Sequence, residues 1–108
     1  MSYAVQELPR AKADKRAILV WLLKERSPQG GKAWLKAYDD LLVRLEQDAA
    51  RHGHALENDD CQHLDVQQAL FKTRRGRGYR VLFFIEGSDV YVLRVRGPGQ
   101  APLDPEQL

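Results

Sequence analysis

The chain has a single cysteine, a single methionine and no long apolar run. A lone Cys61 cannot form a disulfide within the chain, so we expect a reducing, cytoplasmic location. The longest apolar run, Ala17 to Leu23, is well short of the roughly 18 residues that a membrane-spanning helix needs. The first residues also lack the basic flank and apolar stretch of a secretion signal. We therefore expect neither membrane insertion nor export.

The composition is that of an ordinary soluble protein, with 44% apolar and 30% charged residues. A chain of 108 residues can bury one core, so we expect a single domain over residues 1–108. The formal net charge is only +2, but it is unevenly distributed. Residues 1–65 hold ten bases against eleven acids, whereas residues 66–108 hold seven bases against four acids. The positive charge therefore belongs to the second half of the chain.

Two helices are predicted in the first half. Apolar residues recur at intervals of three and four over residues 11–26, which is typical of a helix with one buried face. Ser27 followed by Pro28 is a typical helix start, so we expect a second helix over 28–52, with Gly53 near its carboxyl-terminal cap. Because so few residues join the two helices, they are expected to be antiparallel. The apolar stripe of the second helix consists of Trp34, Tyr38, Leu41, Leu42, Leu45 and Ala49.

Strands are predicted at both ends of this helical pair. Residues 2–8 alternate weakly between apolar and polar side chains, and three stronger strand-like runs follow after a polar connection at 53–65. Glycines in the two intervening turns are expected to supply positive φ angles for tight hairpins. The three later strands are expected over residues 67–74, 79–86 and 90–96, with turns at 75–78 and 86–89.

These elements predict an α+β fold with the order β-α-α-β-β-β. The simplest arrangement is a small antiparallel sheet with the antiparallel helical hairpin packed on one face. Trp34 and Tyr38 are expected to join the second helix to the sheet as core residues. The opposite sheet face is expected to be open, and it is the first place to look for function.

The three later strands carry seven basic residues, whereas residues 68–96 contain only two acids. So many like charges repel one another unless an anion or an acidic partner is bound. We therefore expect a basic sheet face that grips a polyanion. The basic residues are Lys72, Arg74, Arg75, Arg77, Arg80, Arg94 and Arg96.

The register of the first hairpin decides whether two of these cations share a face. If Arg74 pairs with Gly78, Lys72 faces Arg80 across the strands. If Arg74 pairs with Tyr79 instead, Lys72 and Arg80 lie on opposite faces. The sequence permits both registers, and we favour the first. It leaves Tyr79, Val81, Phe83, Ile85, Val90 and Val92 to form the layer under the helices.

This order of elements and several local motifs resemble the RelE/ParE superfamily of bacterial toxins. The resemblance covers nearly the whole chain, from Tyr3 to about Gly97, and indicates the superfamily better than its branch. It is carried by Ser27-Pro28 with Ala33-Trp34, the Leu41/Leu42/Leu45 ladder, Leu70-Phe71-Lys72, the Gly78 to Phe83 element GYRVLF, Glu86 to Asp89 and the valine-rich Val90 to Val95.

The resemblance implies the toxin component of a type II toxin-antitoxin pair, neutralised by a cognate antitoxin. ParE-like members inhibit DNA gyrase, whereas RelE-like and HigB-like members cut mRNA on the ribosome. If this chain were a nuclease of that kind, the resemblance would make Lys72 and Arg80 its catalytic residues. The residues with binding roles would be Arg74, Arg75, Arg77, Arg94 and Arg96, and Tyr91 would belong to the antitoxin-binding surface. Because the two helices would help to hold the antitoxin, Trp21 or Leu42 would be partly exposed in its absence.

The tail after the last strand bears on the choice between these branches. RelE-like enzymes place a Tyr or His there, but residues 97–108 contain no Tyr, His, Lys or Arg. The tail offers only the carboxylates Asp104 and Glu106, and an ordinary carboxylate, with a pKa near 4, is poorly matched to proton transfer at neutral pH. We therefore favour ParE-like gyrase inhibition over the ribosome-dependent mRNA endonuclease. A degenerate, non-toxic binding module of the same fold and a plain RNA-binding domain remain alternatives.

His52, His54, Cys61 and His63 superficially resemble a set of zinc ligands. Their spacing differs from that of zinc fingers, and the chain has no paired cysteines. We expect a polar loop with incidental histidines, although His63 could act as a substitute base near the basic site. Neither a metal ion nor a small-molecule cofactor is expected.

Overall fold

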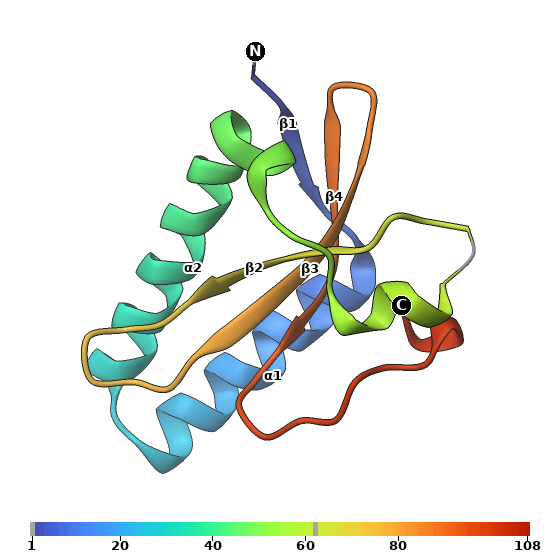
Figure 1. Ribbon diagram of the computed structural model, residues 1–108. Helices are drawn as coiled ribbons and strands as arrows, with labels where there is room; N and C mark the ends of the chain where they lie inside the picture. The colour runs from blue at the N-terminus through green and yellow to red at the C-terminus, as the bar shows by residue number, and fades with distance from the viewer. Residues whose placement is uncertain (1, 62) are drawn as a thin grey trace.

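Four strands form one sheet in the order β1-β4-β3-β2, and two helices pack against it (Figure 1). This computed structural model describes residues 2–61 and 63–108. It confirms the predicted α+β class and the order β-α-α-β-β-β. Its elements are β1 (Ala4–Glu7), α1 (Pro9–Glu25), α2 (Pro28–Asp48), η1 (Ala49–Arg51), η2 (Leu56–Asp60), β2 (Gln67–Phe71), β3 (Tyr79–Glu86), β4 (Asp89–Arg96) and η3 (Pro105–Gln107).

The sheet is antiparallel except at one edge. Strands β2, β3 and β4 form the expected antiparallel meander, but β1 pairs with β4 in parallel, from Ala4 opposite Asp89 to Glu7 opposite Val92. The helical pair lies between β1 and the meander in the sequence, so it provides the long connection that a parallel neighbour requires.

Both helices cover the same face of the sheet. The side chain of Ser27 accepts a hydrogen bond of 3.0 Å from the Gly30 amide and starts α2 as predicted, with Pro28 in its first turn. Trp34 and Tyr38 are almost fully buried, which confirms their predicted core position. The same core contains the side chains predicted to form the layer under the helices, namely Tyr79, Val81, Phe83, Ile85, Val90 and Val92.

The opposite sheet face is covered, so the prediction of an open face is wrong. Leu82 and Leu93 are buried there against Val66, Ala55 and Leu103. The cover consists of the segment that contains η2 and of the carboxyl-terminal tail, which lie together on the right of Figure 1. Large apolar side chains on both faces of β3 and β4 need shielding from water on both sides, and two helices can shield only one.

A β-bulge in β4 contributes to this second core. Leu82 pairs with Arg94, but its neighbour Phe83 pairs with Val92, so Leu93 is the extra residue. The extra residue lets Leu93 point to the covered face while Val92 and Val95 point towards the helices.

The first hairpin has neither of the two registers considered from the sequence. Leu70 rather than Lys72 lies opposite Arg80, and β2 ends at Phe71 instead of residue 74. The connection is therefore a loop over residues 72–78. Within the described chain, positive φ angles occur only at Gly87 and Gly99, so this loop does not use the tight glycine turn that was predicted.

Across residues 2–61 and 63–108, no helix combines the length and apolarity needed to cross a membrane.

Candidate functional site

The seven basic residues of the meander fall into two groups. Lys72, Arg74, Arg75 and Arg77 lie in the β2–β3 loop and are exposed; we call them the loop cations. Arg80, Arg94 and Arg96 lie on β3 and β4, partly covered by the tail; we call them the strand arginines. The single basic face expected from the sequence is thus divided.

Arg80 is held by a buried carboxylate. Its guanidinium donates hydrogen bonds of 2.9 and 3.0 Å to the two carboxylate oxygens of Glu57, and a third of 3.2 Å to Gln68 Oε1. The Glu57 side chain is 0% exposed and also accepts the Leu103 amide at 3.1 Å. The arrangement ties β3, η2 and the tail together.

The protonation of Glu57 follows from these contacts. Burial acts to raise the pKa of Glu57, but the hydrogen bonds from Arg80 and from the Leu103 amide outweigh it, and the pKa is lowered. Glu57 is therefore ionised at neutral pH and neutralises the charge of Arg80. A structural ion pair thus accounts for the main contacts of the side chain that had been expected to be catalytic.

Arg94 is engaged in the same way by α1. It donates hydrogen bonds of 2.7 and 2.9 Å to Asp14, which raise the pKa of Arg94, and one of 2.6 Å to the Gln107 carbonyl. Asp14 also accepts the Val95 amide at 2.9 Å. β1 pairs with β4 only as far as Val92, so no strand lies beside Val95 at this edge of β4. The Asp14 carboxylate accepts the Val95 amide hydrogen bond in place of a neighbouring strand.

Arg96 differs from the other two strand arginines because no carboxylate forms an ion pair with it in the described structure. It lies opposite Arg80 in the sheet and donates one hydrogen bond of 2.7 Å to the Ala101 carbonyl. Its Nε is buried and has no hydrogen-bond partner in the described structure. Burial and the neighbouring Arg94 lower its pKa. The covered face therefore keeps one poorly satisfied cation beneath the tail.

The loop cations are available to a partner. None of the four forms an ion pair with the described part of the chain. Lys72 lines a shallow groove of about 710 Å³ between α2 and β2, together with Asp40 and Arg44. Arg75 and Arg77 line a second groove near the end of α1.

Tyr91 lies apart from both groups of cations. It stacks on Phe84 with ring centroids 5.1 Å apart, near the β3–β4 turn, and is half-buried. The structure therefore places Tyr91 outside the contacts that hold the strand arginines.

The four candidate metal ligands do not form a recognised site. His52 lies 3.0 Å from Asp48 one turn earlier, and His54 forms an isolated bridge with Gln67. Cys61 is half-buried and His63 is exposed. Among residues 2–61 and 63–108, no group of three or more His, Cys, Asp or Glu side chains is placed to hold a metal ion.

Two residues that organise the site were missed from the sequence. Asp14 lies on a helix with no distinguishing motif, and Glu57 lies in a segment read as a polar connection. Four acids near one another at 57–65 offered no signal that one of them is buried. Their contacts lie 80 and 23 residues away along the chain, beyond the reach of local patterns.

The comparisons with known proteins agree on the fold. No protein-family model matches the sequence, and no curated protein is significantly similar to it. The chromosomal ParDE toxin-antitoxin system from P. aeruginosa superposes with a TM-score of 0.67 at 16% identity, covering 88% of this chain and 95% of the other.

Two further structures are similar. The toxin-antitoxin complex RelBE2 from Mycobacterium tuberculosis gives a TM-score of 0.53 at 24% identity, covering 89% of this chain and 98% of that chain. A mutant of the E. coli toxin RelE in the free state gives 0.51 at 18% identity, covering 92% and 86%. The predicted RelE/ParE fold is therefore confirmed.

Proposed function

We propose that this chain is the toxin component of a type II toxin-antitoxin pair and that it arrests growth through its loop cations. The observation that carries the proposal is the similarity to the ParDE system over 88% of the chain. Residues 72–77 present four exposed cations on one loop, which suits an anionic target or an acidic partner.

The partner is a cognate antitoxin. Val20, Trp21 and Leu23 on α1 and Val43 on α2 are each at least half exposed, from 50% for Trp21 to 59% for Val43. These four exposed apolar side chains on the two helices are candidates for burial by a protein partner. An antitoxin that covers them would remove this surface from water, and its acidic residues would meet the loop cations.

Gyrase inhibition is the favoured mechanism. Ribonucleolytic cleavage needs a group that accepts the proton of the ribose 2′-hydroxyl and donors that stabilise the charge on phosphorus. Arg80 is neutralised by Glu57, and the only titratable side chains of the tail are Asp104 and Glu106. Asp104 is occupied in the capping box of η3. A non-nucleolytic toxin requires no such proton transfer.

Ribosome-dependent mRNA cleavage is the second candidate, and one observation favours it. Arg80, Arg94 and Arg96 converge beneath the tail, where the Arg96 Nε has no partner in the described structure. Movement of residues 98–108 away from the sheet would expose these donors to a phosphate. This candidate predicts cleavage products, which gyrase inhibition does not.

The first test is inducible expression of the chain without a partner. We expect growth arrest that is relieved by replacing Arg74, Arg75 and Arg77 together with glutamine. The matched control replaces Lys12, Arg16 and Arg51, three exposed cations outside the loop, and should remain toxic. If the chain does not arrest growth although it is folded and soluble, it is a non-toxic module of this fold.

The second test separates the two mechanisms. Purified protein is assayed for inhibition of DNA supercoiling by gyrase and for cleavage of mRNA on ribosomes. Arg80→Ala alone is a poor probe because it leaves Glu57 buried without its partner. We expect the wild type to inhibit gyrase without cleaving mRNA, and the double variant Glu57→Gln with Arg80→Gln, which removes both charges, to keep that inhibition. If the wild type does cleave mRNA, the double variant should lose the cleavage. Cleavage by the wild type would overturn the gyrase assignment.

A further inference from the structure

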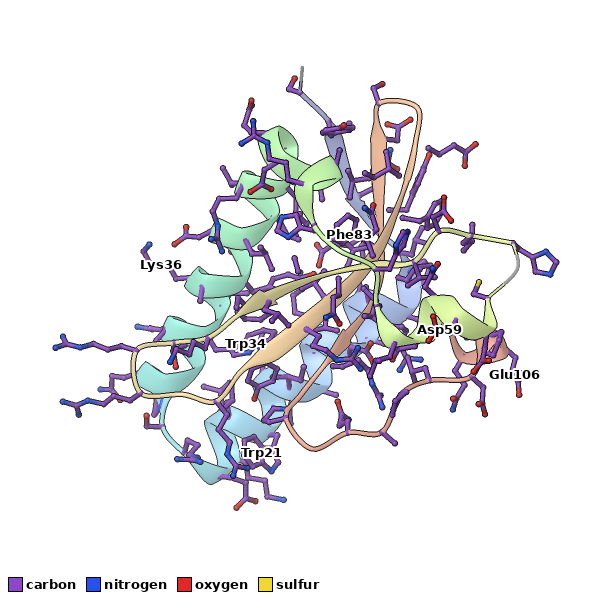
Figure 2. All side chains as sticks on the ribbon, in the orientation of Figure 1. Trp21, Trp34, Lys36, Asp59, Phe83 and Glu106 are labelled. Atoms are coloured by element: carbon purple, nitrogen blue, oxygen red, sulfur yellow. The ribbon has the colours of Figure 1, made fainter. Side chains whose placement is uncertain are left out.

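A second groove lies at one end of the helical layer. It has a volume of about 660 Å³ and runs between the end of α1, the β2–β3 loop and the residues that follow β4. Trp21 lies at the lower end of α1 in Figure 2, and Trp34 lies inside, between α2 and the sheet. Both line the groove, whose other lining residues include Arg26, Arg75, Arg77 and Tyr79.

The groove is strongly cationic. Arg26, Arg75 and Arg77 are exposed, and none forms an ion pair within residues 2–61 and 63–108. No Asp or Glu is among the residues that line it. Burial raises the pKa of the Tyr79 hydroxyl, and the positive charge of Arg26 partly offsets that rise. Three uncompensated guanidinium groups around one groove suit a ligand with several phosphate oxygens.

The aromatic side chains of the groove provide a surface for a planar group of the ligand. Trp21 is 50% exposed, so a large part of its ring can receive a planar group. Trp34 is only 2% exposed, yet its Nε1 has no hydrogen-bond partner in the described chain. The Trp34 ring packs edge-to-face against Tyr79 with centroids 5.5 Å apart. Trp34 therefore contributes to the wall of the groove, whereas Trp21 supplies the accessible aromatic face.

We propose that this groove binds a nucleoside polyphosphate, with the phosphates on Arg26, Arg75 and Arg77 and the base against the exposed face of Trp21. Trp21 stacks on its face, as aromatic side chains do with single bases. The volume falls within the range of about 300–1,000 Å³ that is usual for small-molecule sites.

This ligand fits the groove better than phosphate alone. Inorganic phosphate would use the arginines but would leave the exposed face of Trp21 without a partner. A nucleoside without phosphate would leave the three cations uncompensated. The inference is independent of toxicity, because it rests on a groove that includes Arg26 and both tryptophans rather than on the loop cations alone.

Intrinsic fluorescence provides a direct measurement. The chain contains only two tryptophans, and both line the groove, so a bound base should quench the emission of the full-length protein. The probes are ATP and GTP, adenosine, inorganic triphosphate and a short single-stranded oligonucleotide. We expect saturable binding of at least one nucleoside triphosphate, at least about tenfold tighter than adenosine or inorganic triphosphate. Binding should weaken as salt is added.

Four variants locate the site. Arg26→Gln, outside the β2–β3 loop, should weaken nucleotide binding about tenfold. Trp21→Ala removes the exposed stacking face and should have a similar effect. Trp34→Phe keeps an aromatic ring in the groove wall and removes only a buried donor, so nucleotide affinity should stay within about twofold of the wild type. The matched control is Arg51→Gln, an exposed cation of η1 outside the groove, which should bind normally.

Several outcomes would overturn the proposal. Equal affinity for inorganic triphosphate and for ATP would show that the base makes no contact. Binding of the oligonucleotide but of neither nucleoside triphosphate would assign the cations to a nucleic-acid backbone. Unchanged nucleotide binding by Arg26→Gln and Trp21→Ala, two exposed substitutions that a folded protein should tolerate, would place the ligand elsewhere.

Discussion

Arg80 and Glu57 form a two-point ion pair, with distances of 2.9 and 3.0 Å, although 23 residues separate them in the sequence. The carboxylate is completely buried, whereas the Arg80 side chain is 19% exposed. Glu57 also accepts the amide of Leu103, so a single side chain fixes β3, η2 and the tail. The residue expected to provide the chemistry is thus part of what closes the covered face of the sheet.

The first prediction concerns this ion pair. Glu57→Gln should lower the free energy of unfolding by about 3 kcal/mol, because Arg80 loses its counter-charge and stays mostly buried. Urea unfolding at neutral pH measures the change. The control is Asp40→Asn, which breaks the exposed pair with Lys36 and should leave stability nearly unchanged. Equal effects of the two substitutions would contradict the role assigned to Glu57.

The second prediction is a loss of stability in acid. The hydrogen bonds of Glu57 and Glu7 lower their pKa values below the ordinary value of 4.5, in spite of burial, which acts to raise them. The folded state therefore binds fewer protons than the unfolded state near that pH, and stability is present above it. Stability should decline as the pH falls below about 4.5, through the lowered pKa values.

Glu57→Gln provides the control for this pH dependence. Because the variant has no carboxylate at position 57, the stability difference between wild type and variant should narrow as the pH falls. Unfolding free energies measured at neutral pH and at several acidic pH values test this directly. A difference that stays constant down to strongly acidic pH would mean that Glu57 is not the titrating group.

The third prediction tests the contact between β1 and α2. The hydroxyl of the fully buried Tyr38 donates a hydrogen bond of 2.7 Å to Glu7, and burial followed by this contact raises the pKa of Tyr38. Tyr38→Phe should cost about 1.5–2.5 kcal/mol, since a bond to a charged acceptor is lost while Lys15 still partners Glu7. Tyr91→Phe, which removes a hydroxyl with no hydrogen bond in the described structure, should cost less than about 0.5 kcal/mol in the same unfolding measurement.

The fourth prediction concerns the tail. Leu103 is 7% exposed and packs with Leu82 and Leu93 on the covered face. Leu103→Ala should cost about 2–3 kcal/mol in thermal or urea unfolding, whereas Leu56→Ala, at a side chain that is 65% exposed, should be nearly neutral. If Leu103→Ala proved as mild as Leu56→Ala, the tail would not be part of the second core.

The local patterns of the sequence predicted the elements well because each depends on neighbouring residues. Ser27 and Pro28 start α2 as expected, and the stripe with Trp34 and Tyr38 is buried as its period indicated. The strand boundaries of β3 and β4 also agree within a residue or two. The parallel pairing of β1 was not predicted, because strand neighbours depend on the path of the whole chain.

The amino-acid sequence by itself determined the α+β class, the order of elements and the excess of cations on the meander, since these follow from local periodicity and composition. The tertiary structure alone decided which cations remain available. Glu57 and Asp14 neutralise Arg80 and Arg94 from distant elements, and the tail covers the sheet face that was expected to be open. Charge compensation and burial depend on contacts across 23 and 80 residues of chain, which only the folded structure brings together.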